Sequence, residues 1–154
     1  MLIPETQLTT AAWNTSASTS GGYLNSSIHK TTLPTIANNL KKVLGTHLIN
    51  RNVLLSSSIN SNGYANNYKW TTAYATLMSI GQLTGTFEKN KNKYDDGEAN
   101  YKLPLFDHMD YKTGYDFWSR GISDSSGAWC VYHGRVTDLG AHSAYGIRPL
   151  IYIR

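Results

Sequence analysis

The C-terminal segment 115–154 constrains the fold more than any other part of the chain. It holds three short aromatic or apolar runs, at 115–121, 127–134 and 145–154, which are separated by Ser, Gly and Asp residues. Runs of this length, bounded by turn-forming residues, predict strands of a small antiparallel sheet. Two of the four Trp residues lie in these runs, and each buries a large area. We therefore expect the core to form around this sheet.

A helical pattern precedes the sheet. A short helix capped by Ser26 or Ser27 is expected to run through Thr31, and Pro34 suits the first turn of a second helical run. Gly45 is a typical stop residue for that run. Apolar residues recur between them with the period of an α-helix and are expected to form one face: Leu33, Ile36, Ala37, Leu40, Val43 and Leu44.

The middle of the chain is less regular. We expect a short strand at 53–55 and an Asn/Ser/Gly loop at 56–68. A second helix is predicted to begin at Thr71 or Thr72 and to run to about Ile80, and a charged loop follows. With the strands after 115, these elements predict an α+β fold.

The first twenty residues are rich in Thr and Ser and contain few apolar side chains. We expect residues 1–20 to form an extended arm, with one edge strand around 6–13 and Trp13 as its anchor. The rest, 21–154, is expected to form one domain, because no repeat or linker divides it.

Charge and hydropathy exclude several classes of protein. Only 16% of the residues are charged and the net charge is +4. The basic residues are dispersed, so no nucleic-acid-binding stripe is expected. No apolar run reaches membrane-spanning length, and the start of the chain lacks the pattern of a signal peptide, so neither membrane insertion nor secretion is expected.

Catalytic and metal-binding patterns are weak. There is no G-x-S-x-G, no phosphate loop and no pair of His residues at helical metal-binding spacing. Asp95–Glu98 offers carboxylates and a glycine for Ca²⁺, but a solvated acidic turn explains it as well. Cys130 lies in an expected apolar strand. We expect it to be a small buried apolar residue, and a catalytic thiol is the alternative. We expect no enzyme activity, no cofactor and no metal.

Arg148 is the most informative charged residue. It lies between Ile147 and Pro149 in the last apolar run. A buried cation must be paired or hydrogen-bonded. We expect it to pair with Asp116 or a backbone carbonyl, and a ligand-anchoring role is the alternative.

Several short motifs, in this order along the chain, resemble a family of C-type-lectin-like domains. They are Trp13-Asn14-Thr15, Thr19-Ser20-Gly21-Gly22-Tyr23 with Ser26, Leu33-Pro34, Leu44-Gly45-Thr46-His47-Leu48, Phe117-Trp118-Ser119-Arg120 and Gly146-Ile147-Arg148-Pro149. The family is common in bacteriophages, prophages and bacterial surface proteins. The closing motif also resembles formylglycine-generating-enzyme-like domains and phage tropism proteins varied by diversity-generating retroelements.

The resemblance implies a fold of two helices on a small twisted antiparallel sheet, with long irregular loops that present a ligand surface. The chain departs from related proteins in its chemistry. It lacks the Glu-Pro-Asn, Gln-Pro-Asp and Trp-Asn-Asp motifs of calcium-dependent lectins, and with a single cysteine it lacks both their disulfides and the cysteine pair of formylglycine-generating enzymes. The resemblance therefore implies the fold without its metal-dependent sugar binding or oxidase chemistry.

Our functional hypothesis is a non-enzymatic phage protein of the virion surface, made in the bacterial cytoplasm, that binds a host glycan or protein receptor. The alternative is a decoration or assembly protein that docks on another virion protein. A homo-oligomer is expected in both cases. Expected ligand contacts, besides the segment 90–101, are Tyr64, Asn66, Asn67, Tyr68, Trp129, Tyr132, His133, Arg135, His142 and Tyr145. Expected structural residues are Trp13, Trp118, Arg120, Arg148 and Pro149.

Overall fold

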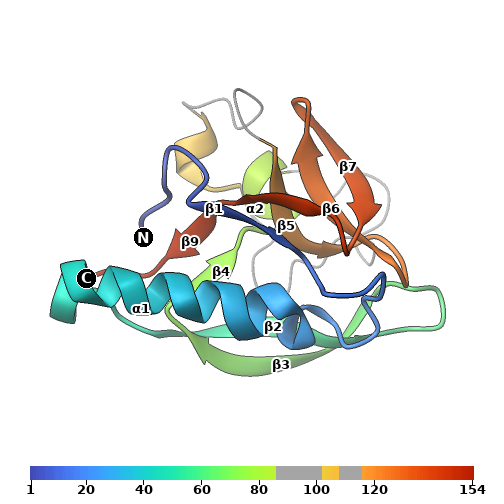
Figure 1. Ribbon diagram of the computed structural model, residues 1–154, viewed down its shortest axis with the longest axis horizontal. Coiled ribbons are helices and arrows are strands. Elements are labelled where there is room, and N and C mark those ends of the chain that lie inside the picture. Colours follow the sequence, from blue (N-terminus) through green and yellow to red (C-terminus); the bar gives the residue numbers. More distant parts are fainter. Residues whose placement is uncertain (86–101, 108–115) are drawn as a thin grey trace.

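The computed structural model describes residues 1–85, 102–107 and 116–154. The described chain has a mixed α+β fold, with one main helix and several small sheets (Figure 1). Its elements are β1 (Thr9–Ala12), η1 (Tyr23–Asn25), η2 (Ile28–Thr32), α1 (Leu33–Leu44), η3 (Gly45–His47), β2 (Arg51–Ile59), β3 (Ala65–Ala73), β4 (Ala75–Leu77), α2 (Ile80–Thr84), η4 (Pro104–Asp107), β5 (Phe117–Ile122), β6 (Gly127–Tyr132), β7 (Arg135–Gly140), β8 (Ala144–Ile147) and β9 (Pro149–Ile151).

The largest sheet has five strands in the order β1-β8-β5-β6-β7. The β5–β8 pair is parallel and the other three pairs are antiparallel. The three predicted C-terminal runs form β5, β6, β8 and β9, and β7 is an additional strand that the sequence reading did not include. β5 and β6 are buried along almost their whole length, which explains their continuous apolar pattern.

The predicted N-terminal edge strand is confirmed. β1 pairs with β8 from Thr9↔Ile147 to Ala12↔Ala144 and forms one edge of the five-stranded sheet. Trp13 follows β1, is fully buried, and donates a hydrogen bond from Nε1 to the Ser119 carbonyl at 3.2 Å. The segment 9–13 is therefore part of the core structure.

The predicted helix 33–44 is also confirmed. Pro34 lies in the first turn of α1, and Gly45 ends the helix with φ 55°, a conformation that favours glycine. The preceding residues Ile28–Thr32 form a wider π-helical turn, where a short helix through Thr31 was expected. The predicted apolar face is only partly right. Leu33 and Ala37 are buried, but Val43 is 82% exposed.

Two predictions for the middle of the chain are wrong. The predicted loop 56–68 is a turn only at 60–64, because β2 and β3 form a long antiparallel hairpin on either side of it. The predicted helix 71–80 is instead the end of β3 followed by β4, which pairs with β9. Asn60 holds the hairpin turn: its side-chain oxygen accepts from the backbone N–H of Asn62 and Tyr64, and Gly63 has φ 81°. A helix does form, but only over Ile80–Thr84, where Ser79 and Gln82 make a capping box.

The 71–80 error has a physical cause. Leu77, Met78 and Ile80 are all buried, so the chain is surrounded by protein on several sides there. A run that is buried on all sides has no polar face, and its apolar period cannot distinguish a helix from a strand.

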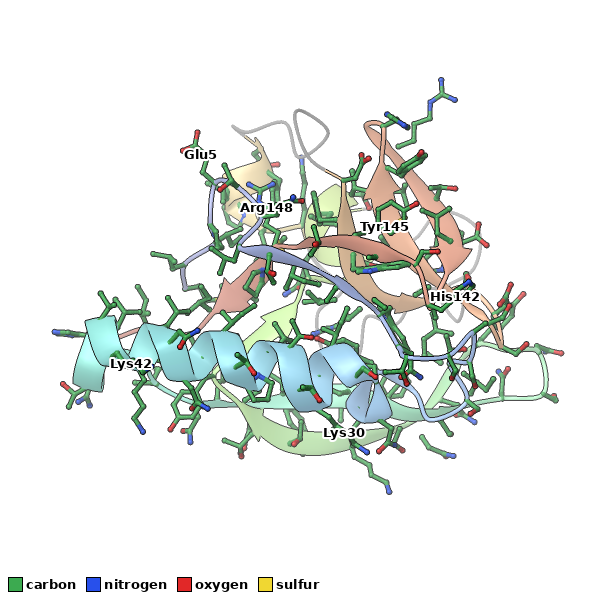
Figure 2. The ribbon with its side chains drawn as sticks, in the orientation of Figure 1. Glu5, Lys30, Lys42, His142, Tyr145 and Arg148 are labelled. Atoms are coloured by element: carbon green, nitrogen blue, oxygen red, sulfur yellow. The ribbon has the colours of Figure 1, made fainter. Side chains whose placement is uncertain are left out.

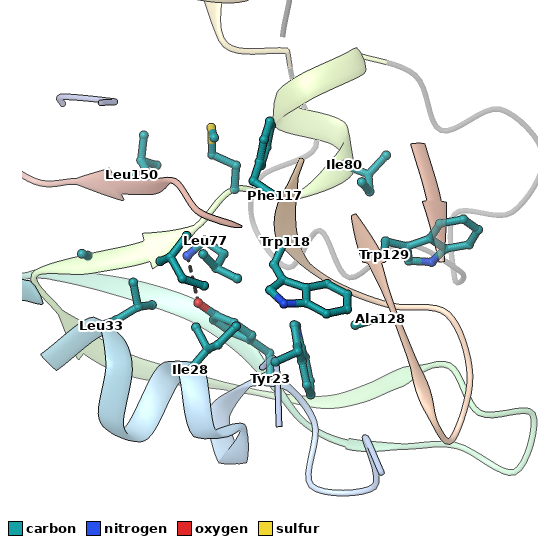
Figure 3. Packing of buried hydrophobic residues seen from close by; sticks show 14 of the residues in the cluster. Tyr23, Ile28, Leu33, Leu77, Ile80, Phe117, Trp118, Ala128, Trp129 and Leu150 are labelled. Atoms are coloured by element: carbon teal, nitrogen blue, oxygen red, sulfur yellow. Dashed lines mark hydrogen bonds between the residues drawn. The ribbon is translucent and has the colours of Figure 1, made fainter. Parts of the chain in front are cut away.

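The core joins the sheets to α1 through large aromatic side chains (Figure 3). Trp13, Tyr23 and Trp118 are fully buried. The Tyr23 hydroxyl accepts a hydrogen bond from the Leu77 backbone N–H at 2.8 Å, and Trp118 Nε1 donates to the Ala11 carbonyl at 3.0 Å. The polar atoms of these buried rings are thereby satisfied.

The residues expected to be structural are all buried. Arg148 donates from Nε to the Pro4 carbonyl at 2.8 Å, and its guanidinium lies 5.5 Å from the Phe117 ring. This confirms the expectation of a backbone carbonyl partner. Arg148 lies close to the N-terminal loop that carries Glu5 (Figure 2) and so connects the start of the chain to its last strands.

Candidate functional site

The outer face of the β2–β3 hairpin carries the largest exposed aromatic side chain of the described chain. Trp70 is 63% exposed and Tyr68 is 38% exposed. Alternate residues of a strand share a face, so Tyr68, Trp70 and Thr72 lie on the same side of β3. Thr72 donates a hydrogen bond to the Asn52 side chain on β2 at 3.0 Å. We call Asn52, Tyr68, Trp70 and Thr72 the aromatic face.

This face differs from an ordinary strand surface. Leu54 pairs with Trp70 in the register and is only partly exposed. Solvent-facing strands usually carry polar side chains, because an exposed indole leaves a large apolar area in water. An exposed aromatic pair beside amide and hydroxyl groups is chemically suited to a ligand with both apolar and hydroxyl surfaces.

Four predicted ligand residues lie on this hairpin. Tyr64 is half-buried next to the turn, and Tyr68 belongs to the aromatic face. Asn67 is exposed but has φ 50°, and its side chain donates to Ser58 Oγ at 2.8 Å. Its amide nitrogen therefore holds the hairpin together. Asn66, also predicted, is exposed on β3.

A second group gathers at the β6–β7 turn. The Tyr132 ring lies 4.1 Å from His133 and 5.6 Å from Tyr145, and Arg135 pairs with Tyr132 in the strand register. His133 has φ 46°, and its backbone N–H donates to Asp116 Oδ1 at 2.7 Å. We call Tyr132, His133, Arg135 and Tyr145 the turn cluster.

The turn cluster adjoins the N-terminal strand. Tyr145 pairs with Ala11 in the register of β8 and β1, and its ring meets Trp118 edge-on at 5.2 Å. Partial desolvation and, to a smaller extent, the nearby Tyr132 raise the pKa of Tyr145 above its ordinary value. Its phenol is therefore protonated at neutral pH.

The two remaining predicted residues lie elsewhere. Trp129 is only 7% exposed and lies on the opposite face of the sheet from Trp118 (Figure 3), so it presents little surface to a ligand. His142 is exposed but lies beyond β7, near the other end of β6, because Gly127 pairs with Gly140. Figure 2 shows it apart from Tyr145. The structure thus divides the predicted ligand residues between the hairpin and the turn cluster, with Trp129 and His142 outside both.

Trp70 was missed by the sequence reading, because it lies between a segment assigned as loop and one assigned as helix. Two signals were available. Asn62-Gly63 is a strong hairpin turn, and Asn66, Tyr68, Trp70 and Thr72 alternate with the period of a strand.

The remaining chemistry of the described residues is limited. Cys130 is fully buried. Desolvation is the main cause that raises its pKa to about 12, and the charges of Asp116 and Asp138 add to it. Its thiol is therefore protonated at neutral pH and is a poor nucleophile. Within 1–85, 102–107 and 116–154, no three His, Cys, Asp or Glu residues group to hold a metal. Asp95–Glu98 and the contacts expected within 90–101 lie outside the described residues.

Across the same described ranges, none of the helices has the length and apolar character required to cross a membrane. Comparison of the chain with protein-family models, with curated proteins and with solved structures found no match.

Proposed function

We propose that this protein is a non-enzymatic, C-type-lectin-like component of a phage virion surface that binds a host-cell glycan through the aromatic face. The observation that carries the proposal is the exposure of Trp70 beside Tyr68 on a rigid hairpin. The motif resemblance supports the phage context and the fold.

The chemistry of the face fits a sugar. One side of a pyranose ring presents C–H groups, which pack against an indole, while its hydroxyls require hydrogen-bonding partners at the rim. Thr72 and Asn52 provide such groups, and they are already oriented by their mutual hydrogen bond. Binding of this kind needs no calcium.

Single-site affinity on an open face is weak, and a virion compensates by presenting many copies. Linked sites act at a high effective concentration, which raises the overall avidity without new contacts. A homo-oligomer on a symmetric particle provides this arrangement.

The test is binding of the purified protein to intact candidate host cells and to a glycan array, with Trp70→Ala and Val43→Ala compared. Val43 is an exposed apolar residue on α1, so its replacement is a matched control. We expect Trp70→Ala to weaken binding about tenfold or more, about 1.4 kcal/mol, and Val43→Ala to leave it unchanged. Equal binding by both variants would contradict the proposal.

The second candidate function is docking on another virion protein through the turn cluster. The observation that favours it is that Tyr132, His133, Arg135 and Tyr145 gather beside β1, and Tyr and Arg are enriched in protein interfaces. His133→Gly keeps the positive φ of the turn, and Arg135→Ala removes an exposed cation. Loss of association with purified capsids or tails in these variants, with cell binding intact, would establish this role.

A further inference from the structure

A cavity of about 230 Å³ lies between α1 and the end of the β2–β3 hairpin. It is well below the roughly 300–1,000 Å³ typical of sites for drug-sized ligands, so it accommodates one ring rather than a chain of rings. Its walls come from the π-helical turn, the first half of α1 and the strand residues that follow Trp70. The lining residues are His29, Leu33, Pro34, Ala37, Asn38, Thr72, Ala73, Tyr74 and Ala75.

His29 is the unusual member of this lining. Its Nδ1 atom is buried and has no hydrogen-bond partner in the described part of the chain. Leaving a buried polar atom without a partner costs about 1–3 kcal/mol, so such atoms in folded proteins call for an explanation. His29 also lies in a π-helical turn, a rare element that occurs frequently at functional sites.

The His29 ring is fixed and uncharged. It packs against Tyr23 with 5.3 Å between the ring centroids, and its backbone N–H donates to Ser26 Oγ. Burial, followed by the charge of Lys30, lowers the pKa of His29 to about 4. At neutral pH the imidazole in the cavity lining is therefore neutral.

The aliphatic part of the lining favours an uncharged group with a methyl, while Asn38, Thr72 and Tyr74 supply its polar part. Leu33, Ala37, Ala73 and Ala75 are aliphatic. A carboxylate or ammonium group would lose its hydration here, and hydroxyls facing these side chains would lack partners. A methyl group packs against such a wall without that cost.

The cavity is connected to the aromatic face by Thr72. This residue lies two positions after Trp70 on the same side of β3 and also lines the cavity. A glycan stacked on Trp70 would thus meet a cavity-lining residue two positions further along β3.

We propose that the cavity binds a single uncharged, methyl-bearing sugar ring, of the 6-deoxy or N-acetyl kind, with a polar group on His29 Nδ1 and its methyl against the aliphatic wall. This rests on the proposed glycan binding by the aromatic face. It gives that binding its specificity, because a recess lined on several sides discriminates by shape more strongly than a flat stacking face does.

The test is a nuclear magnetic resonance titration of the full chain with L-fucose, N-acetylglucosamine, glucose and p-cresol. We expect saturable chemical-shift changes at His29, Leu33 and Ala37 with one or both methyl-bearing sugars. Glucose should bind at least about tenfold more weakly. Ala37→Leu fills part of the cavity, and His29→Phe removes the unpartnered nitrogen. Each variant should abolish the shifts while its melting curve shows a folded protein.

Ser123→Ala is the matched control. Ser123 Oγ is also buried without a hydrogen-bond partner in the described chain, but Ser123 is not part of the cavity lining. This variant should bind the sugars as the unchanged protein does.

Three results would overturn the proposal. They are no saturable shift with either methyl-bearing sugar, equal binding of glucose, and a response to p-cresol alone, which would indicate a protein side chain as the occupant. Cell binding that is lost in Trp70→Ala but retained in Ala37→Leu would overturn the cavity assignment and leave the proposed function intact. Cell binding retained in both would contradict the function itself.

Discussion

The five-stranded sheet and the β2–β3 hairpin are both antiparallel for most of their length, but they use aromatic residues in opposite ways. All six residues of β5 are buried, including Phe117 and Trp118. β3 has five consecutive exposed residues, including Trp70. The same residue type therefore stabilises the fold in one sheet and is left available for contact in the other.

The comparison separates residues that the fold requires from those that it does not. Trp118 is enclosed and hydrogen-bonded, so replacing it alters the core. Trp70 has most of its surface in water already, so folding gains little from it. Stability measurements on matched substitutions test this distinction directly.

The largest effect is expected from Trp118→Ala. The substitution leaves a cavity beside Tyr145 and removes the hydrogen bond to Ala11. We expect the free energy of unfolding to fall by about 3–5 kcal/mol, as for other large-to-small core substitutions. Denaturant unfolding followed by tryptophan fluorescence measures it, and a loss below about 1 kcal/mol would mean that this sheet is not the stabilising core.

The next effect is a dependence of stability on pH through His29. Its folded pKa of about 4 is below the ordinary value of 6.5, so the unfolded chain binds a proton first as the pH falls. Stability is therefore complete above pH 6.5 and is lost towards pH 4, by about 3 kcal/mol at most.

Chemical denaturation at a series of pH values measures this loss. In His29→Phe the free energy of unfolding should fall less between pH 6.5 and pH 4, because the loss caused by protonation of His29 is removed. An identical pH profile in the variant would show that His29 is not buried in its neutral form.

Asp124→Ala should have an intermediate effect on the sheet. Its Oδ1 accepts hydrogen bonds from the backbone N–H of Ser126 and Gly127, both at 2.7 Å, in the β5–β6 turn. These bonds lower the pKa of Asp124. We expect a loss of about 1 kcal/mol, measured by thermal unfolding, with Asp138→Ala on β7 as the exposed control.

The smallest effect on stability is expected from Trp70→Ala, although it has the largest expected effect on glycan binding. An exposed substitution away from caps and core typically changes stability by less than about 0.5 kcal/mol. A melting temperature close to that of the unchanged protein, together with lost binding, would confirm the contrast between the two sheets. A strong destabilisation would show that Trp70 is instead a structural residue.

Local signals account for what the sequence predicted correctly. α1 has a clear apolar period between Pro34 and Gly45, and the aromatic strands after residue 115 are short runs between turn residues. Burial of Cys130 and a carbonyl partner for Arg148 followed from the chemistry of each residue. None of these inferences required knowledge of distant contacts.

The errors lie where distant contacts decide the structure. The Asn- and Ser-rich composition of β2 and β3 suggested a loop, but pairing along Arg51–Ile59 and Ala65–Ala73 stabilises two strands. The predicted ligand residues were separated because strand order, which the sequence does not show, puts Tyr68 and Tyr132 on different sheets. His29 carries no distinguishing local pattern, because its environment is set by packing against Tyr23.

The pairing of β1 with β8 has a consequence for how the protein is made. Thr9 pairs with Ile147, and the Leu2–Ile151 bridge joins still more distant residues. A ribosome releases β1 first, and its partner strand β8 emerges only after all the intervening residues have been made. The nascent chain must therefore keep β1 unpaired until β8 is made, and the five-stranded sheet closes only after residues 144–147 have left the exit tunnel.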